Sequence, residues 1–226
     1  MIFRSVFLFL VIIFFQSNCI ADGFFENKSD LIENNFPRLS YGVAVTDFND
    51  DENFEFVITG FKYPNLLLGF KNGSYKNLMS DEEFASYSRS TIGVAACDID
   101  GDGFEELYFL NTDAYSGEKR HSDSLLDKTT SITDLFKLEK NSKNSNLTAG
   151  RSVACIDRNG DGKYGVYVSN YGGPSRLYEL QNELLIDVSS NAGTDFTTGG
   201  RSVVSGHILS DNMDIFAGNE RGPNFL

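Results

Sequence analysis

The sequence has no tryptophan, four prolines, three cysteines and two histidines among 226 residues. With only His121 and His207, it lacks the histidine clusters that hold zinc or act as paired acids and bases. Three cysteines are too few for a disulfide-stapled scaffold. Basic residues are also scarce: 19 Lys and Arg face 32 Asp and Glu, a formal net charge of −13. This charge excludes nucleic acid and anionic membrane surfaces as expected partners.

No apolar stretch beyond the N-terminus is long enough to cross a bilayer. Residues 1–21 instead have the pattern of a signal peptide, in which Arg4 precedes an unbroken apolar run of ten, Val6–Phe15. Cys19-Ile20-Ala21 is the small-residue cleavage site. A membrane anchor is the weaker alternative, because a span needs about 20 apolar residues. We therefore expect a secreted, extracellular protein with no membrane insertion after signal removal.

Acidic residues occur at regular spacing in the stretch 93–110, GVAACDIDGDGFEELYFL. Gly103 stands where a short loop needs a sharp turn. Calcium takes six to eight oxygen ligands. At positions 1, 3, 5, 7 and 9 the loop offers four carboxylates and one backbone carbonyl, from Asp98, Asp100, Asp102, Phe104 and Glu106. We expect a calcium loop between two strands; the alternative is a solvated acidic hairpin without an ion. An EF-hand is excluded because Phe109 stands where its bidentate Glu is required.

The same unit recurs along the sequence. Anchored on position 1, its copies start at Asp47, Asp98, Asp157 and Gly206, at intervals of 51, 59 and 49 residues. Each unit reads as four short strands, and that period predicts an all-β fold, a β-propeller of four-stranded blades. A lead (22–38) precedes a partial propeller (39–226) with blades at about 39–88, 89–147, 148–197 and 198–226.

The other three loops depart from the pattern in different ways. The first offers Asp47, Asn49, Asp51 and Glu55 but has Glu52 in place of the glycine at position 6. The third offers Asp157, Asn159 and Asp161, with Gly165 in place of the acid at position 9. The fourth keeps only Asp214, and we expect it to be metal-free. Calcium is the expected ion, because magnesium demands tighter octahedral geometry and zinc lacks Cys and His ligands.

Two cysteines, Cys97 and Cys155, remain after signal removal. They precede their loops by one and two residues, so their side chains point to opposite faces of their strands, as a disulfide between neighbouring blades requires. Two buried free thiols are the alternative. The three N-x-S/T sequons predict glycosylation of Asn27, Asn72 and Asn146.

Three further segments carry local predictions. A short helix is expected over residues 127–138. Residues 116–124 and 139–148 are polar and predict long surface loops.

The strand–DxDGDG–strand units followed by G-x-P-N resemble FG-GAP (VCBS-type) repeats, as in the integrin alpha head. The segments GVAACDIDGDGFEELYFLNTDAYSG, AGRSVACIDRNGDGKYGVYVSNY and GRSV…DIFAGNERGPNFL are similar to the cartilage acidic protein 1 family, over roughly residues 39–226. The resemblance implies a secreted, calcium-binding glycoprotein of the extracellular matrix or cell surface. It also implies a seven-bladed propeller followed by an acidic-type region and an EGF-like module.

No catalytic motif is present, so we expect a non-enzyme that binds a matrix or cell-surface protein. The alternatives are a hydrolase or lyase built on an FG-GAP propeller, and a purely structural calcium scaffold. A carboxylate or histidine pair in a deep central pocket would favour the hydrolase. Tyr115, Tyr171 and Phe61 are candidate docking residues, although packing between blades or along loops is the more common role of such aromatics.

The fourth unit reaches Leu226 after about half its strands, so we expect an incomplete propeller of about three and a half blades, the N-terminal part of a longer product. Such a protein is expected to expose apolar surface and self-associate. The alternative is a four-bladed form in which residues 31–36 supply the missing strand.

Overall fold

The computed structural model describes residues 25–128 and 131–226. The predicted signal peptide lies outside the described residues. The described residues contain far more strand than helix, and all pairings between the named strands are antiparallel, so the all-β expectation is confirmed. No helix in the described part of the protein is long and apolar enough to cross a bilayer.

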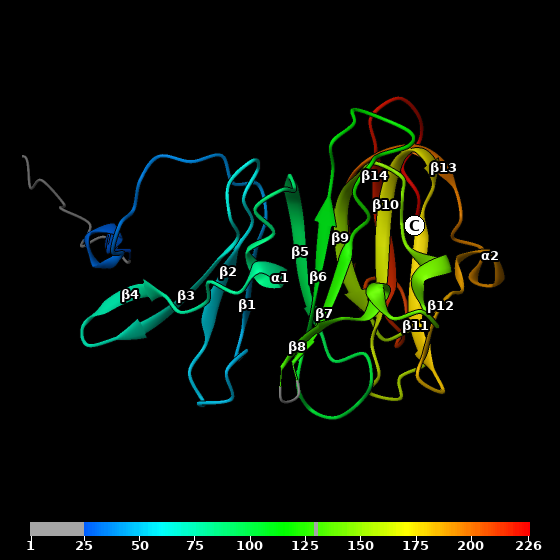
Figure 1. Ribbon diagram of the computed structural model, residues 1–226. Helices are drawn as coiled ribbons and strands as arrows, with labels where there is room; N and C mark the ends of the chain where they lie inside the picture. Colours follow the sequence, from blue (N-terminus) through cyan, green and yellow to red (C-terminus); the bar gives the residue numbers. More distant parts are fainter. Residues whose placement is uncertain (1–24, 129–130) are drawn as a thin grey trace, which may run out of the picture.

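The strands form three sheets (Figure 1). The first sheet contains β1 (Val43–Thr46), β2 (Glu55–Ile58), β3 (Leu66–Lys71) and β4 (Ser74–Asn77). The second contains β5 (Thr91–Cys97), β6 (Glu106–Asn111), β7 (Ser124–Lys128) and β8 (Ile132–Asp134). Both have their strands in sequence order, as expected of a repeated hairpin unit.

The third sheet joins the last two sequence repeats. It contains β9 (Gly150–Ile156), β10 (Gly165–Pro174), β11 (Arg176–Gln181), β12 (Leu184–Asp187), β13 (Thr197–Gly206) and β14 (Asp214–Asn219). The first part of β10 pairs with β9 and β11, whereas its last residues pair with β13, with Tyr171 opposite Gly199. Because β10 is shared in this way, the sheets alone do not give a number of blades.

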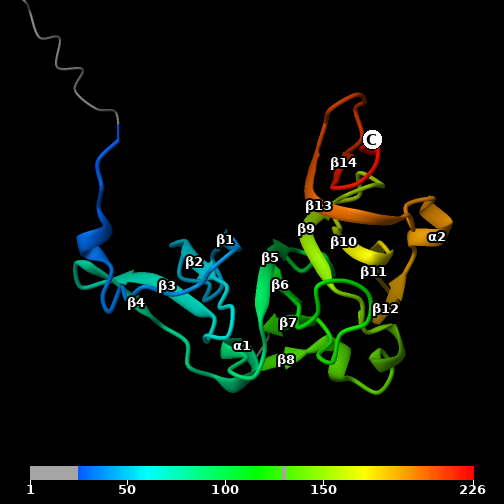
Figure 2. The same ribbon diagram turned by 90° about the horizontal axis from the view of Figure 1, so that it is seen from above.

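The first strands of the repeats lie side by side. In sequence order β1 neighbours β5, β5 neighbours β9, and β9 neighbours β13, and the sheets fan outward from them (Figure 2). The approach is close: a Cβ on Gly42 would stand 2.9 Å from the Cα of Gly93. Small residues in these strands therefore permit the contact between neighbouring sheets.

Strand β6 shows how the core forms between the sheets. All six of its residues are buried. Leu107 and Phe109 pack with Val57 and Leu67 of the first sheet, whereas Tyr108 and Leu110 pack with Val166 and Val168 of the third. Successive strand residues point to opposite faces, so a continuous apolar run fits a sheet that is covered on both sides.

The helix expected over 127–138 is absent from the described residues. That segment contains the end of β7, strand β8 and a 3₁₀ turn, η2 (Leu135–Lys137). The Asp134 carboxylate accepts from the backbone N–H groups of Leu125 and Phe136, at 3.2 and 3.1 Å. A side chain that bonds backbone in this way competes with helix formation. The remaining short helices are η1 (Ser29–Leu31), α1 (Glu82–Ala85), η3 (Ser142–Asn144) and α2 (Ser189–Ala192).

The predicted surface loops 116–124 and 139–148 contain a buried polar cluster. Lys119, Asp123 and Asn146 are each at most 3% exposed. Lys119 forms an ion pair with Asp123, whose Oδ2 also accepts from the Tyr108 hydroxyl at 2.7 Å. These three polar residues are buried because their partners satisfy them, so the expectation of exposure fails for them, whereas most other residues of the two loops are exposed or half-buried.

The same cluster corrects one glycosylation prediction. Nδ2 of Asn146 donates to Oδ2 of Asp123 at 2.7 Å and to Oδ1 of Asn170 at 3.0 Å. A fully buried amide with both donors engaged has no space for a glycan, so the prediction for Asn146 is wrong for this fold. Asn27 and Asn72 are exposed, and their glycosylation stays a prediction.

The described part of the lead contacts the first sheet. Ile32 bridges Tyr75 of β4 in parallel, and Glu33 pairs with Lys76 at 3.0 Å. Residues 31–36 therefore lie beside β4, so the alternative in which they complete the fourth unit is wrong.

Candidate functional site

The acidic loops join the first and second strands of their repeats, and all lie at the same end of the molecule (Figure 1). We call them loops 1 to 4, after β1, β5, β9 and β13. In loop 2, Asp98, Asp100 and Glu106 each place a carboxylate oxygen within 4.8 Å of the other two. No other such group of three acidic, Cys or His ligands occurs among the described residues. Loop 2 thus has the donor set that a hard cation prefers.

Backbone hydrogen bonds fix the shape of loop 2. The N–H groups of Gly101 and Gly103 donate to the two oxygens of Asp98, at 2.7 and 3.0 Å. The N–H of Ile99 donates to Oε2 of Glu106 at 2.8 Å. A carboxylate oxygen has a second lone pair, so these bonds orient the carboxylates and still leave them able to bind a cation.

The electrostatics of loop 2 favour a bound positive charge. Burial, with Asp100 nearby, raises the pKa of Glu106 to about 8. Burial and the neighbouring acids Asp102 and Asp98 also raise the pKa of Asp100. Carboxylates this close oppose one another's ionisation unless a cation joins them. The residues present therefore fit calcium by donor chemistry as well as by position.

Loop 1 repeats the backbone of loop 2 without its glycines. Asp50 and Glu52 have φ of +58° and +64°, where loop 2 has Gly101 and Gly103 at +80° and +95°. Asn49 donates to Oε1 of Glu55 at 2.5 Å, so these two candidate ligands bond each other. The sequence signals the left-handed residue at position 6, where Glu52 replaces the glycine of the pattern. The second one, at position 4, was missed, although the first glycine of DxDGDG signals it.

Loop 3 has the same frame with fewer carboxylates. The N–H groups of Gly160 and Gly162 donate to the Asp157 oxygens at 2.7 and 3.0 Å. Asp161 accepts from the N–H of Lys163 at 3.0 Å, and Arg158 pairs with Glu179. Asp157 and Asp161 are its only acids, and Asn159 is the third candidate ligand.

The register of loop 4 corrects its anchor. Gly206 pairs with Asp214, just as Cys97 pairs with Glu106 in the second repeat. Gly206 therefore precedes the loop, His207 takes position 1, and the loop is one residue shorter. Oδ2 of Asp214 accepts from the N–H groups of Ile208 and Leu209, at 3.1 and 2.7 Å, which closes the turn.

Loops 2 and 3 are held together at their bases. Cys97 of β5 and Cys155 of β9 form a disulfide with Cα atoms 5.7 Å apart, directly before the two loops. The N–H of Tyr164 donates to the carbonyl of Asp98 at 2.9 Å. These two links tie the bases of the neighbouring loops together.

Two residues of β7 near loop 2 were not predicted. The pKa of Asp127 is raised by burial and by Asp100 and Asp102, so its carboxylate lies within the field of the loop. Lys128 donates to the carbonyl of Phe48 in loop 1 at 2.8 Å. It also borders a cavity of about 470 Å³ between loops 1 and 2, which Asp47, Asp102 and Glu106 line. Both residues are far from the loops in sequence, so no local motif indicated that Asp127 or Lys128 would lie beside them.

The aromatic residues predicted to dock a partner gather at the opposite end of the first strands. Tyr115 and Phe61 line a cavity of about 870 Å³ there, and Tyr171 packs edge-on against Tyr115 with ring centroids 5.2 Å apart. Asp113 and His121 also line the cavity, but the Asp113 oxygens accept from Arg120, at 3.0 and 3.1 Å. No hydrogen bond joins Asp113 to His121 within the described residues.

Comparison with known proteins gives one group of relatives. No family model matches the chain. Cartilage acidic protein 1 of Homo sapiens is 42% identical over 220 residues, covering 86% of this chain and 33% of the relative. The Xenopus tropicalis and Mus musculus proteins of that name are 42% and 41% identical, with 34% of each covered. These relatives support the cartilage acidic protein 1 family for this chain. The chain spans about a third of their length.

One solved structure resembles the fold distantly. It is the Vibrio cholerae biofilm matrix protein Bap1, with a TM-score of 0.43 and 20% identity, covering 78% of this chain and 24% of that one. This likeness is too low to support an argument about fold or function.

Proposed function

We propose that this protein is the calcium-binding β-propeller portion of a secreted member of the cartilage acidic protein 1 family, built from FG-GAP-type repeats. Its role is that of an interaction module for a matrix or cell-surface protein. The observation that carries the calcium assignment is the convergence of Asp98, Asp100 and Glu106 on a loop held by two left-handed glycines. The 42% identity to proteins named for cartilage supports the extracellular assignment.

The proposed ligands of loop 2 are Asp98, Asp100, Asp102, the carbonyl of Phe104, and Glu106. Bound calcium supplies two positive charges that offset the mutual repulsion of these carboxylates. The protein's own part is to orient them: Gly101 and Gly103 fix Asp98, and Ile99 fixes Glu106. Loops 1 and 3 are proposed as weaker sites, since each has fewer carboxylates in the pattern. Extracellular modules bind calcium at about 10⁻⁴–10⁻³ M, so extracellular calcium fills such sites and they act as structural staples, not as sensors.

Loops held in shape by bound calcium give the module a rigid surface. Loop 2 connects β5 and β6 of the second sheet. The hydrogen bond from Tyr164 and the Cys97–Cys155 disulfide link it to the third sheet. Preorganised surfaces bind partners with less loss of conformational entropy. Calcium therefore supports binding in this proposal without itself touching the partner.

Thermal unfolding of the secreted protein tests the calcium assignment. A ligand that binds only the native state raises the Tm by mass action. Millimolar calcium is expected to raise the Tm and magnesium to raise it less. Asp98→Ala or Asp102→Ala should remove more of the gain than Asp161→Ala of loop 3, the matched control. Equal Tm values with calcium and with chelator would overturn the assignment.

A further inference from the structure

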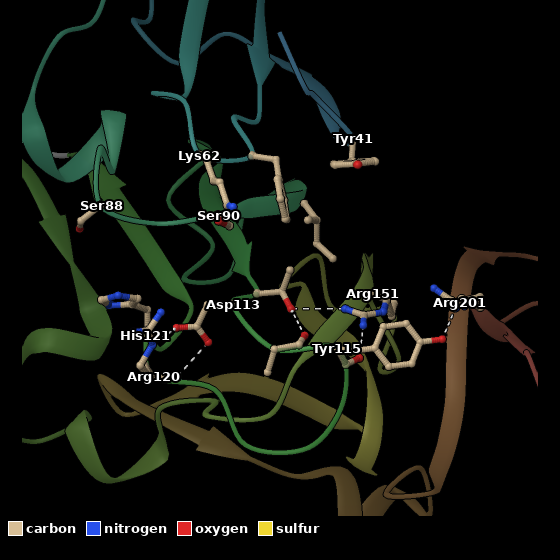
Figure 3. A pocket seen from close by; sticks show the side chains of 14 residues that line it. Tyr41, Lys62, Ser88, Ser90, Asp113, Tyr115, Arg120, His121, Arg151 and Arg201 are labelled. Atoms are coloured by element: carbon tan, nitrogen blue, oxygen red, sulfur yellow. Dashed lines mark hydrogen bonds and ion pairs between the residues drawn. The ribbon is translucent and has the colours of Figure 1, made fainter.

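A positively charged cavity lies at the end of the first strands away from the calcium loops (Figure 3). Strand β5 rises about 3.3 Å per residue, which puts its Ile92 end roughly 20 Å from loop 2. The cavity, of about 870 Å³, is lined by residues from all four repeats. Its cationic lining consists of Lys62, Arg120, Arg151 and Arg201. In a protein with a net charge of −13, this concentration of cations calls for a specific explanation.

The two central arginines occupy the same place in successive repeats. Arg151 and Arg201 each follow the glycine of a GRSV segment, in β9 and β13. The guanidinium carbon of Arg151 lies 5.4 Å from the ring centroids of both Tyr115 and Tyr171. Arg201 lies 5.9 and 5.3 Å from the same two rings. One tyrosine pair therefore holds both cations by cation–π contacts and fixes their positions.

Neighbouring carboxylates neutralise only part of the positive charge of this cavity. Arg201 pairs with Glu220 at 3.0 Å and Arg120 with Asp113 at 3.1 Å. Among the described residues no carboxylate lies within ion-pair distance of Arg151 or Lys62. The Nη atoms of Arg151 donate hydrogen bonds to the Thr112 hydroxyl and to the carbonyls of Gly150 and Tyr115. The Nε of Arg151 is buried and has no hydrogen-bond partner among the described residues. Burial and the neighbouring Arg201 lower the pKa of Arg151.

We propose that this cavity, centred on Arg151 and Arg201, binds a carboxylate group presented by a partner protein. One proton on Nη2 of Arg151 and the Nη1 group of Arg201 are not used by the bonds above, so each arginine can donate a charge-assisted hydrogen bond to a carboxylate, and their fixed positions lower the entropic cost. Tyr41, Phe61 and Tyr115 supply apolar walls for the residues that flank the carboxylate. This inference rests on the proposed role as an interaction module and names its surface and the chemistry of its partner.

The charge distribution favours a protein carboxylate over a long sulfated polysaccharide. A polyanion extends well beyond a cavity of this size and would meet the acidic remainder of the surface, which repels it. A single acidic residue, or the C-terminus of a polypeptide, places its charge inside the cavity and neutral atoms around it. Apolar walls also suit a peptide segment better than a sulfated sugar.

The test uses the full secreted protein in calcium, with binding followed by the NMR signals of the arginine Nε–H groups. The main probe is the pentapeptide Gly-Phe-Glu-Asp-Gly, acetylated and amidated at its ends. A second arm is the acetylated peptide Gly-Phe-Gln-Asn-Gly, whose side chains are uncharged and whose C-terminal carboxylate is free. The matched blank is the same acetylated peptide with an amidated C-terminus. Saturable binding of either carboxylate peptide, without binding of the blank, is expected, and the two arms separate a side-chain source from a terminal one.

Substitutions locate the binding. Arg201→Gln and Arg151→Gln are each expected to weaken binding about tenfold, the loss of one charged hydrogen bond. Lys140→Gln, a surface site outside the cavity lining and the calcium loops, removes the same charge and should leave binding unchanged. All three variants should keep the calcium-induced Tm shift. A failure of the carboxylate-binding proposal is therefore distinguishable from a failure of the calcium assignment. Binding of a heparin-derived hexasaccharide alone, no binding by any probe at millimolar concentration, or wild-type affinity in both arginine variants would overturn the proposal.

Discussion

Glu52 shows how single residues set the quality of each loop. At the matching position Gly103 and Gly162 have φ of +95° and +84°, and Glu52 is held at +64°. A side chain in the left-handed region costs about 1–2 kcal/mol, part of which glycine returns through its freer unfolded state.

Glu52→Gly is therefore expected to stabilise the protein by about 0.5–1 kcal/mol. Urea unfolding measures the change. Glu52→Gln removes the same charge without freeing the backbone, so it separates strain from electrostatics. A glycine variant no more stable than the glutamine variant would show that position 6 is unstrained.

The Asn146 amide belongs to the buried cluster around Asp123. We expect the secreted protein to carry no glycan at Asn146, because both amide donors are engaged in the core. Glycopeptide mass spectrometry gives the occupancy, with Asn72 of the exposed β3–β4 turn as the comparison site. Asn146→Ala should cost about 1–3 kcal/mol, the penalty for unpaired buried groups. A folded protein glycosylated at Asn146 would contradict the placement of this cluster.

Among the elements, the β5–β9 pair is joined covalently. The Cys97–Cys155 bond closes a loop with a sequence separation of 58 residues. The lost entropy of the unfolded state gives such a cross-link a stabilisation of about 4 kcal/mol. The paired variant Cys97→Ser, Cys155→Ser is expected to lose about that much in urea unfolding. Reductant should lower the stability of the wild type but not of the variant; a wild type indifferent to reductant would contradict a structural role for the bond.

Elements with a local sequence signature, such as turns, were predictable from the sequence, and elements defined by tertiary contacts were not. The turns after Lys71 and Gln181 follow from sequence, since Asn72 and Asn182 both take left-handed φ between strands. The extension of β10 toward β13 did not follow, because a ten-residue strand serving two repeats has no local signature. The helix expected at 127–138 failed because Asp134 bonds backbone N–H groups across β7 and η2.

At the scale of the whole molecule, the two ends of the first strands differ in charge. Acidic loops gather at one end and the arginine cavity at the other. The sequence predicted the first because its ligands lie within one loop. It did not predict the second, since Lys62, Arg120, Arg151 and Arg201 come from four separate repeats and meet only through the packing of β1, β5, β9 and β13.

Calcium binding at loop 2 is the central claim, and its most direct measurement is the calcium stoichiometry by isothermal titration, for the wild type and for Glu106→Gln. Glu106 belongs to the converging group and is 3% exposed, so the substitution removes a ligand charge with little change of shape. The account predicts that the tightest calcium site of the wild type is lost in the variant, while weaker binding at loops 1 and 3 remains. A variant that keeps the tightest site with unchanged affinity would contradict the assignment of calcium to loop 2.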